Sequence, residues 1–327
     1  MKIGIIGAGA WGTALAQVAA ANDDPVLLWA FEEEVVRAVN DTHCNSIYLP
    51  DNALNPVIRA TGDLNDLSVC DALLVVTPAQ HLGAILQHAP VDGKPLILCS
   101  KGIEAGTQRL MSEVAGDVHP GAPIAVLSGP TFAHEVAAGL PTAITLACTD
   151  SVLGEAIVAR LARPQFRPYL SDDVIGAEIG GAVKNVLAIA CGVVEGSGLG
   201  QNAGAALISR GFAEMTRFGL ARGARAETLS GLSGLGDLVL TCSSTSSRNF
   251  SLGKGLGEGR VVADLLADRR SIAEGAFTAP VLQAAARQAG VDMPITDAVC
   301  ALLSGVLSAP EAVHALLARP LRQEYVN

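Results

Sequence analysis

Residues that build metal sites and disulfide frameworks are unpaired in this sequence. Its seven cysteines form no Cys-x-x-Cys pair, and its six histidines form no His-x-x-x-His pair. Zinc sites and redox-active disulfides commonly use such spacings, so we expect neither a metal site nor a disulfide framework. Scattered free thiols are typical of the reducing cytoplasm, which is where we expect this protein.

Positive charge is also sparse. Lysine and arginine together number 22 against 32 acidic residues, which gives a formal net charge of -10, and only five of the 22 are lysines. An acidic chain is not expected to bind nucleic acid broadly. If the ligand is an anion, the few basic residues must be concentrated at its site, so each lysine is informative.

Long uncharged apolar runs are absent as well. None reaches the roughly 20 residues that a membrane-spanning helix needs. The first twenty residues resemble a signal peptide in having Lys2 before an apolar run, but Gly4, Gly7, Gly9 and Gly12 interrupt that run. We therefore expect a soluble protein without integral membrane association. A homodimer is compatible with the sequence, which does not define the oligomeric state.

The glycines near the N-terminus have a different explanation. Residues 2–6 are typical of a short buried strand, Gly7-Ala-Gly-Ala-Trp-Gly12 follows, and residues 13–21 continue as an alanine-rich helix. In this context G-x-G-x-x-G is the fingerprint of a dinucleotide site. Gly7 permits the tight turn, Gly9 lets the backbone approach a pyrophosphate, and Gly12 lets helix pack on strand. The alternative is a glycine-rich turn without a ligand.

The end of the second predicted strand bears on the choice of nucleotide. An acid there usually binds the ribose hydroxyls of NAD, whereas an arginine accommodates the extra phosphate of NADP. Here Phe31 is followed by Glu32, Glu33 and Glu34, and the first basic residue is Arg37. This pattern favours NAD(H) over NADP(H). The three glutamates could equally populate the first turn of the next helix, where acids are favourable.

Further apolar runs predict an α/β fold with two domains. Buried parallel strands are expected at residues 26–30, 72–76, 95–99 and 123–127, and strands at the sheet edge at residues 143–147 and 166–170. Helical periodicity then replaces strand signals, over residues 178–192, 204–218, 261–270, 279–289 and 311–318. We expect a Rossmann-type, doubly wound, mostly parallel sheet in residues 1–171 and an all-α domain in residues 172–327.

Two turns follow predicted strands, where ligands of open α/β sheets gather. Lys101 lies just after the strand at residues 95–99 and is expected to meet the cofactor or an anionic substrate. Gly129 and Thr131 lie in Ser128-Gly-Pro-Thr-Phe-Ala133, a turn that presents backbone N–H groups and hydroxyls. The alternatives are a solvated loop lysine and a simple helix start.

One lysine stands within a predicted helix. Lys184 shares a helical face with small residues that include Gly181 and Ala188, so we expect it to face a cleft. Partial burial disfavours an ammonium and moves its pKa toward neutrality, which suits a general acid or base. The alternative is a lysine at the edge of a core helix.

Two predicted loops in the second half carry polar groups suited to a phosphorylated ligand. Residues 232–237 place Asp237 after a flexible glycine run, and residues 241–249 combine hydroxyls with Ser247, Arg248 and Asn249. Arginine binds phosphate bidentately, and hydroxyls add neutral donors. A polar surface loop is the alternative. Glu274, before a glycine, could contact amide or ribose groups or simply belong to a turn.

Taken together, these segments resemble the bacterial NAD(P)-dependent sn-glycerol-3-phosphate dehydrogenases over nearly the whole chain. The resemblance rests on segments that occur together and in order: Gly4-Ile-Ile-Gly-Ala-Gly-Ala-Trp-Gly12, Ser128-Gly-Pro-Thr-Phe-Ala133, Lys184-Asn185, Leu232-Ser-Gly-Leu-Gly-Asp237, Ser247-Arg-Asn-Phe250 and Ala273-Glu-Gly275. It implies hydride transfer between NAD(P)H and C2 of dihydroxyacetone phosphate or glycerol 3-phosphate, which supplies phospholipid synthesis.

The resemblance also implies roles for individual residues. Lys184 matches the proton acceptor, and Lys101 adds positive charge near the reacting oxygen. Substrate contacts correspond to Lys101, Gly129, Thr131, Lys184, Asp237, Ser247, Arg248 and Asn249. Cofactor contacts correspond to Gly7, Gly9, Trp11, Gly12, Phe31, Lys101, Ala133, Arg248, Ile272 and Glu274. The sequence departs from the family at Phe31-Glu32, where many members carry a basic residue.

Other functions remain compatible with parts of this pattern. Related dehydrogenases that act on a hydroxy acid or a phosphogluconate share the glycine-rich turn and a helix-borne lysine. The hydroxyl run before Arg248 and Asn249 distinguishes this chain from them. A non-catalytic nucleotide-binding regulator is a further alternative, but such a protein does not need Lys101, Lys184, Asp237 and Arg248 together.

Overall fold

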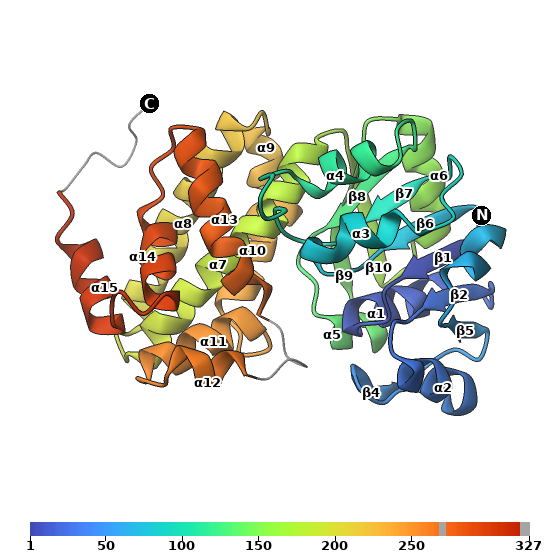
Figure 1. Ribbon diagram of the computed structural model, residues 1–327, viewed down its shortest axis with the longest axis horizontal. Coiled ribbons are helices and arrows are strands. Elements are labelled where there is room, and N and C mark those ends of the chain that lie inside the picture. The colour runs from blue at the N-terminus through green and yellow to red at the C-terminus, as the bar shows by residue number, and fades with distance from the viewer. Residues whose placement is uncertain (268–272, 321–327) are drawn as a thin grey trace.

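Apolar strands and amphipathic helices alternate in the first half of the computed structural model, which describes residues 1–267 and 273–320. This sheet-bearing part lies beside a helical part (Figure 1). The elements of the sheet-bearing part are β1 (Ile3–Ile6), α1 (Ala10–Ala19), β2 (Val26–Trp29), α2 (Glu33–Thr42), β3 (Cys44–Asn45), β4 (Leu49–Ala53), β5 (Ile58–Thr61), η1 (Leu64–Val69), β6 (Ala72–Val75), η2 (Ala79–His81), α3 (Leu82–Leu86), β7 (Leu96–Leu98), α4 (Met111–Val118), β8 (Ile124–Ser128), α5 (Ala133–Ala137), β9 (Thr142–Cys148), α6 (Ser151–Leu161) and β10 (Phe166–Ser171).

The main sheet is mostly parallel, as predicted. Over the described residues its eight strands run in the order β10-β9-β8-β7-β6-β1-β2-β5, and only the β8–β9 pair is antiparallel. One buried cluster joins Ile3 and Ile5 to α1, α2, α5 and α6, while another joins Ile6 to α3 and α4. Helices therefore cover both faces. The strand order reverses at β1, where ligands of such sheets bind.

The helical part begins after β10, and none of its described residues forms a strand. Its elements are α7 (Val174–Gly196), α8 (Gln201–Ala221), α9 (Ala226–Leu229), the π-helical turn η3 (Leu232–Gly236), α10 (Asp237–Cys242), α11 (Arg248–Gly257), α12 (Val262–Leu266), α13 (Glu274–Gln288), α14 (Pro294–Leu303) and α15 (Ala309–Leu317). The fold class therefore agrees with the prediction. The last three residues of the helix predicted at 261–270 lie outside the described residues.

Several elements were not among the predictions. Strand β5 pairs with β2 at one edge of the sheet, and β3 and β4 form a separate antiparallel hairpin. Helix α14 begins at Pro294, which suits the first turn of a helix, and α11 occupies most of the segment that follows the predicted polar loop. Strands of two to five residues carry too little alternation to be recognised by pattern.

Helix α7 is the central element of the helical part. Its residues Gly176 to Val193 are all buried, and α8, α10, α11, α13 and α14 pack around it. It is long and apolar enough to cross a membrane, but 89% of its apolar window lies inside the protein, as in a core helix. Ile103 and Leu110 of the sheet-bearing part join its hydrophobic cluster, so the two parts share a core.

Two glycines let α11 lie directly against α7. A Cβ atom on Gly192 would lie 2.0 Å from the Phe250 carbonyl oxygen, and one on Gly253 would lie 1.9 Å from the Ile189 carbonyl oxygen. The backbones can approach this closely only because neither position has a side chain. The close contact fixes the first turn of α11, which carries Ser247, Arg248 and Asn249.

A buried carboxylate fastens α8 to the start of α14. Glu214 is 1% exposed and accepts hydrogen bonds from the backbone N–H groups of Ile295 (2.7 Å) and Thr296 (3.3 Å). Burial raises the pKa of Glu214 to about 7, although these hydrogen bonds act in the opposite direction. Glu178 on α7 is also buried, and its pKa is likewise raised to about 7 by burial.

These carboxyl groups predict a pH dependence of stability. Between about pH 4.5 and 7, Glu214 binds a proton in the folded state but not in the unfolded chain. Stability should therefore be greatest below this window and fall as the pH rises through it, by up to about 1.4 kcal/mol per pH unit for each proton. Glu214→Gln keeps an acceptor for Ile295 but removes the titrating carboxyl group. The free energy of unfolding, measured with urea, should therefore decline less steeply with pH in this variant. The exposed-site control Glu155→Gln should retain the wild-type slope; an unchanged slope in Glu214→Gln would contradict the assignment.

Candidate active site

The proposed catalytic lysine of α7 is buried beside a carboxylate. The Lys184 side chain is 7% exposed, and its Nζ lies 2.5 Å from Asp237 Oδ1 and 3.1 Å from Thr241 Oγ1. Asp237 is fully buried at the start of α10, and Thr241 follows one turn later. The i, i+4 spacing puts the carboxylate and the hydroxyl on one helical face, where both reach the same amine.

A second lysine reaches the same carboxylate from the sheet-bearing part. Lys101 follows β7, and its Nζ lies 2.7 Å from Asp237 Oδ2 and 3.4 Å from the Gly129 carbonyl oxygen. Its side chain is 15% exposed. The two lysines predicted from sequence as a catalytic pair therefore meet, although 83 positions separate them, because one carboxylate binds both ammonium groups.

The protein interior changes the protonation of this cluster. Burial lowers the pKa of Lys184 to about 8; Asp237 opposes this shift and Lys101 adds to it. The amine is then mostly protonated at neutral pH but titrates within reach of it. Such a group can both donate and accept a proton, as a general acid–base catalyst must.

Two adjacent glycines of α7 allow the cluster to form. A Cβ atom on Gly181 would lie 3.0 Å from Ser128 Oγ and 3.3 Å from Lys101 Cγ, so this position seats the stem of Lys101. A Cβ atom on Gly180 would lie only 2.2 Å from the Ser233 carbonyl oxygen. The absence of a side chain there lets η3, which leads into Asp237, approach α7.

The first of the two polar loops predicted in the second half is helical instead, which corrects that expectation, whereas the second keeps a non-helical segment at residues 243–247, between α10 and α11. Residues 232–236 form the π-helical turn η3, and Asp237 begins α10 rather than ending a flexible loop. A Cβ atom on Gly234 would lie 1.9 Å from the Leu229 carbonyl oxygen, so the glycines serve tight backbone packing, not mobility. Residues 241 and 242 end α10, and residues 248 and 249 begin α11.

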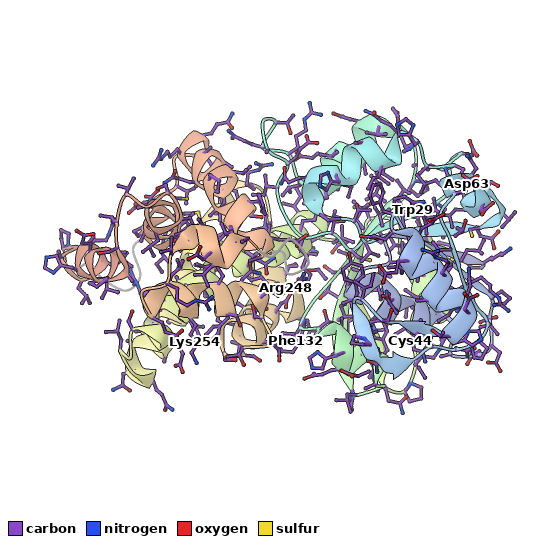
Figure 2. The ribbon with its side chains drawn as sticks, turned by 60° about the horizontal axis from the view of Figure 1, so that its bottom comes forward. Trp29, Cys44, Asp63, Phe132, Arg248 and Lys254 are labelled. Carbon is purple, nitrogen blue, oxygen red and sulfur yellow. The ribbon has the colours of Figure 1, made fainter. Side chains whose placement is uncertain are left out.

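The first turn of α11 presents an exposed arginine between two buried polar residues. Ser247 is the N-cap, and its hydroxyl accepts a hydrogen bond from Phe250 N at 3.2 Å. Asn249 Oδ1 accepts one from Gly275 N at 2.8 Å, which ties α11 to the start of α13. Arg248 lies on the side of the helical part that faces the sheet-bearing part (Figure 2). Its guanidinium is thus free of the packing that fixes Ser247 and Asn249.

Glu274, at the start of α13, belongs to the same electrostatic neighbourhood. Burial raises its pKa, while the charges of Arg248, Lys101 and Lys184 oppose that shift. Three of the predicted site residues are therefore close enough to influence the carboxyl group of a fourth, Glu274. Ile272, which the family resemblance assigns to the cofactor, lies outside the described residues, and its role stays a prediction.

The turn after β8 completes the neighbourhood of Lys101. Gly129 is buried, and its carbonyl oxygen accepts a hydrogen bond from Thr131 Oγ1 at 3.3 Å. Ala133 begins α5, which packs against α1. This contact places α5 beside the helix that follows the glycine-rich turn.

The glycine-rich turn has the shape that a dinucleotide requires. Gly7 has φ +114°, and a Cβ atom on Gly12 would lie 1.8 Å from the Gly7 carbonyl oxygen, so both positions require glycine. A Cβ atom on Gly9 would meet no atom within 4 Å, so space remains open above the N-terminus of α1. Trp11 Nε1 is buried there without a hydrogen-bond partner in the described structure. These residues fit a pyrophosphate at a helix N-terminus.

The end of β2 carries the features that favoured NAD(H). The Phe31 side chain is 84% exposed, and Glu32 is the N-cap residue of α2. Glu33 and Glu34 are exposed in the first turn of α2, so the alternative reading, in which acids populate a helix start, also holds for them. Glu32 differs from its neighbours because Tyr48 donates a hydrogen bond to its Oε1 at 2.7 Å.

Two polar residues of the site were not among the predicted contacts. Thr241 is 4% exposed between Lys184 and Asp237, and Ser128 is 3% exposed with an Oγ that has no partner within the described residues. Thr241 begins the hydroxyl-rich segment at residues 241–249, and Ser128 begins the turn at residues 128–133. A helical reading of residues 237–242 would have found Thr241 through its i, i+4 spacing from Asp237, whereas no sequence signal distinguishes Ser128.

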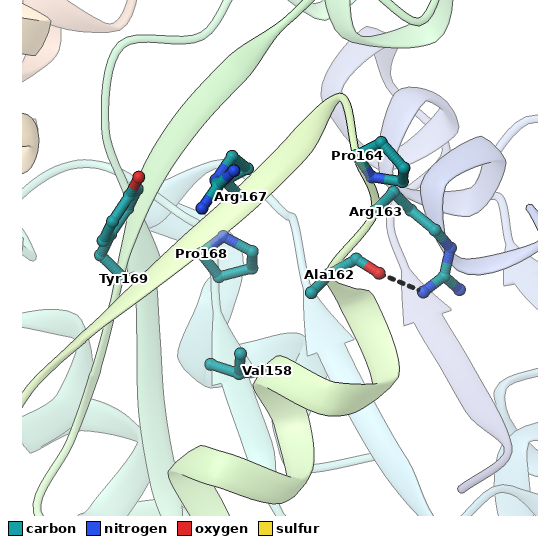
Figure 3. Close-up of a pocket in the computed structure, with 7 residues that line it drawn as sticks. All are labelled: Val158, Ala162, Arg163, Pro164, Arg167, Pro168 and Tyr169. Atoms are coloured by element: carbon teal, nitrogen blue, oxygen red, sulfur yellow. Dashed lines mark hydrogen bonds between the residues drawn. The ribbon is translucent and has the colours of Figure 1, made fainter.

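Two surface hollows lie elsewhere. A cavity of about 360 Å³ is formed by α6 and β10, where Arg163 donates a hydrogen bond to the Ala162 carbonyl oxygen and lies apart from Tyr169 (Figure 3). Another, of about 710 Å³, lies between β10 and α9. Neither is lined by Lys101, Lys184 or Asp237. The candidate site is instead defined by the charged side chains that meet at Asp237.

The glycine-rich turn at the end of β1 and the buried lysine pair define a dinucleotide-dependent dehydrogenase with a helical second part. Two family descriptions match the chain: the N-terminus of NAD-dependent glycerol-3-phosphate dehydrogenase over residues 2–153, and its C-terminus over residues 173–314. The chain belongs to this family.

Individual relatives agree with that membership. The chain is 64% identical over 324 residues to a glycerol-3-phosphate dehydrogenase (NAD(P)+) of Erythrobacter litoralis, with 99% of this chain and 98% of the relative covered. Identity is 65% over 327 residues to one of Novosphingobium aromaticivorans, with the same coverage. The crystal structure of glycerol-3-phosphate dehydrogenase from Coxiella burnetii matches with a TM-score of 0.93 and 38% identity over 97% of this chain and 99% of that one.

The lysine cluster predicts a measurable titration. With ¹³C-labelled lysine, the chain's five lysines should give few NMR signals, and that of Lys184 should titrate near pH 8. Asp237→Asn should lower this pKa further because it removes a negative charge, and Lys101→Met should raise it because it removes a positive one. The Lys94 signal is an internal control that neither substitution should move. A Lys184 pKa unchanged in both variants would exclude the coupling.

Proposed function

We propose that this protein transfers hydride between NAD(P)H and C2 of dihydroxyacetone phosphate, and in reverse from glycerol 3-phosphate. The observation that carries the proposal is the buried contact of Lys184 and Lys101 with one carboxylate, Asp237. Membership of the glycerol-3-phosphate dehydrogenase family and the names of relatives at 64–65% identity support the substrate. Both favour it over a hydroxy acid, a phosphogluconate or a purely regulatory role.

In this proposal the chain first fixes two groups of the substrate, its phosphate and its C2 oxygen. The Arg248 guanidinium binds the phosphate bidentately, with Ser247 and Asn249 holding the turn from which it projects. Lys101 places positive charge at the C2 oxygen. Because the substrate is held at its phosphate and at its C2 oxygen, C2 stays in one orientation, and such positioning is a large part of catalysis.

Lys184 then handles the proton. During reduction, its ammonium gives a proton to the C2 oxygen as negative charge develops there; during oxidation, its neutral amine takes that proton back. Each oxygen of the Asp237 carboxylate lies against one of the two lysine Nζ atoms. The carboxylate orients the amine and offsets part of the positive charge. A bound dinucleotide would be held at its pyrophosphate by the glycine-rich turn, and its nicotinamide would supply the hydride chemistry.

Several further features belong to the proposal. NAD(H) is the favoured nucleotide, supported by the uncharged Phe31 and by Glu32 after β2. The product would supply glycerophospholipid synthesis. The enzyme would work in the cytoplasm as a soluble protein, and a homodimer is compatible with this proposal. The domain border would lie between residues 171 and 172, supported by the end of β10 at Ser171 and the start of α7 at Val174.

The reaction is tested by mixing purified protein, NADH and dihydroxyacetone phosphate and following nicotinamide absorbance. We expect NADH oxidation with dihydroxyacetone phosphate and none with 3-oxo acids; in the reverse direction we expect NAD+ reduction with glycerol 3-phosphate and none with 3-hydroxy acids or phosphogluconate. A protein that binds NADH but gives no substrate-dependent change would be a regulator, which would contradict the proposal. Analytical ultracentrifugation of the same sample would decide the oligomeric state.

The role of Lys184 is tested by substitution. Lys184→Ala should lower kcat by about 10²-fold or more, since it removes a positioned proton-transfer group. Small primary amines added to the buffer should restore part of the rate, a response that a merely structural lysine would not give. Lys94→Ala, far from the cluster, should retain normal turnover. Near-normal kcat in folded Lys184→Ala would rule out the proposed role.

A further inference from the structure

The small β3–β4 hairpin connects the pyrophosphate and adenosine-ribose positions of the proposed nucleotide site. We propose that its residues Tyr48 and Asn45 set the preference for NAD(H) over NADP(H), by fixing Glu32 relative to the glycine-rich turn. The inference rests on the proposed function in taking a nicotinamide dinucleotide as the ligand. It goes beyond that function because it assigns nucleotide selectivity to two hairpin residues that lie outside the turns after β1 and β2.

Asn45 anchors the hairpin to the turn that receives the pyrophosphate. It is 0% exposed, and its Nδ2 donates hydrogen bonds to the Ala8 carbonyl oxygen and to Thr13 Oγ1, both at 2.8 Å. Ala8 lies between the first two glycines of the motif, and Thr13 lies in the first turns of α1. A buried amide satisfied in this way holds its backbone in one place.

The same side chain also fixes the position of Tyr48. Asn45 Oδ1 accepts a hydrogen bond from Tyr48 N at 3.1 Å, which closes the turn between β3 and β4. The Tyr48 hydroxyl in turn donates to Glu32 Oε1 at 2.7 Å. A continuous chain of hydrogen bonds therefore runs from Ala8 through Asn45 and Tyr48 to Glu32.

The position of Glu32 matters because it follows β2, where the adenosine ribose of a bound dinucleotide is read. A carboxylate accepts hydrogen bonds from ribose hydroxyls, whereas it repels a 2′-phosphate with a charge near −2. A free glutamate side chain could rotate away from that phosphate. The hydrogen bond from Tyr48 removes this freedom, so the repulsion stays in place.

Neighbouring charges reinforce the effect. The exposed side chain of Phe31 offers a 2′-phosphate no positive charge, and Glu33 and Glu34 add negative charge. Arg37 is exposed on α2, but it lies one helical turn from Glu33 and Glu34, which partly neutralise it. The charges around the end of β2 therefore repel the 2′-phosphate of NADP(H), and Arg37 on α2 does not compensate for them.

Calorimetric titration of the purified protein with NADH and NADPH, without substrate, tests the inference through binding alone. Wild-type protein should bind NADH at least about tenfold more tightly, as expected when one ligand meets an unpaired like charge. Tyr48→Phe should weaken NADH binding and leave or improve NADPH binding, so that selectivity falls about fivefold, the effect of one lost hydrogen bond. Glu32→Gln should reduce selectivity more, because it removes the charge itself.

The matched control is Tyr169→Phe, which removes the same hydroxyl from a tyrosine on β10 at the far edge of the sheet. It should leave both affinities unchanged. Wild-type preference for NADPH would overturn the inference. So would a Tyr48→Phe variant with unchanged selectivity, or one in which both affinities fall by one factor, since the hairpin would then only support the turn.

These outcomes are separable from a failure of the proposed reaction. If the wild-type protein shows the expected NADH selectivity but does not oxidise NADH with dihydroxyacetone phosphate, the reaction fails and the inference holds. If the reaction proceeds and Tyr48→Phe retains full selectivity, the inference alone fails.

Discussion

The whole site depends on one carboxylate that is shared by two ammonium groups in the interior of the protein. Asp237 brings Lys184 of the helical part and Lys101 of the sheet-bearing part to opposite oxygens of one side chain. Isolated charges are costly to bury, so the two ammonium groups depend on Asp237 to be stable there, and Asp237 depends on them. Two cations and one anion leave a net positive charge, which suits a phosphorylated ligand. The same contact joins the two parts of the molecule.

Helix α7 makes that arrangement possible because it presents different surfaces along its length. Its small residues admit η3 and the stem of Lys101 near one end, and α11 further along. The proton-transfer group and the first turn of α11, with Arg248, are thereby fixed to a common scaffold. Pre-organisation of this kind lets fixed charges act without rearranging during the reaction. The hydrophobic cluster around α7, which includes Ile103 and Leu110, makes the scaffold rigid.

The sequence predicted the fold class well because its signals are local. A glycine motif between a strand and a helix, followed by apolar runs, specifies a Rossmann-type sheet, and the loss of such runs after residue 171 marks the helical part. The hairpin at residues 44–53 was not predicted because its strands are too short to show a periodic pattern. The helical nature of residues 232–237 was not predicted because glycines normally favour loops, whereas here they permit backbone contact with α7 and α9. Shared coordination of Asp237 is a long-range contact that local pattern does not encode.

The tandem glycines of α7 have a consequence for how this enzyme can be redesigned. Gly180 and Gly181 border different neighbours, η3 on one side and the Lys101 stem on the other. A methyl group at Gly180 would push η3 away from α7, and one at Gly181 would press on the side chains of Ser128 and Lys101, so variant libraries gain little by sampling them. The exposed residues 243, 245 and 246, which precede Arg248, tolerate change far better. Diversity directed there could alter which phosphorylated molecules enter while the proton-transfer machinery keeps its shape.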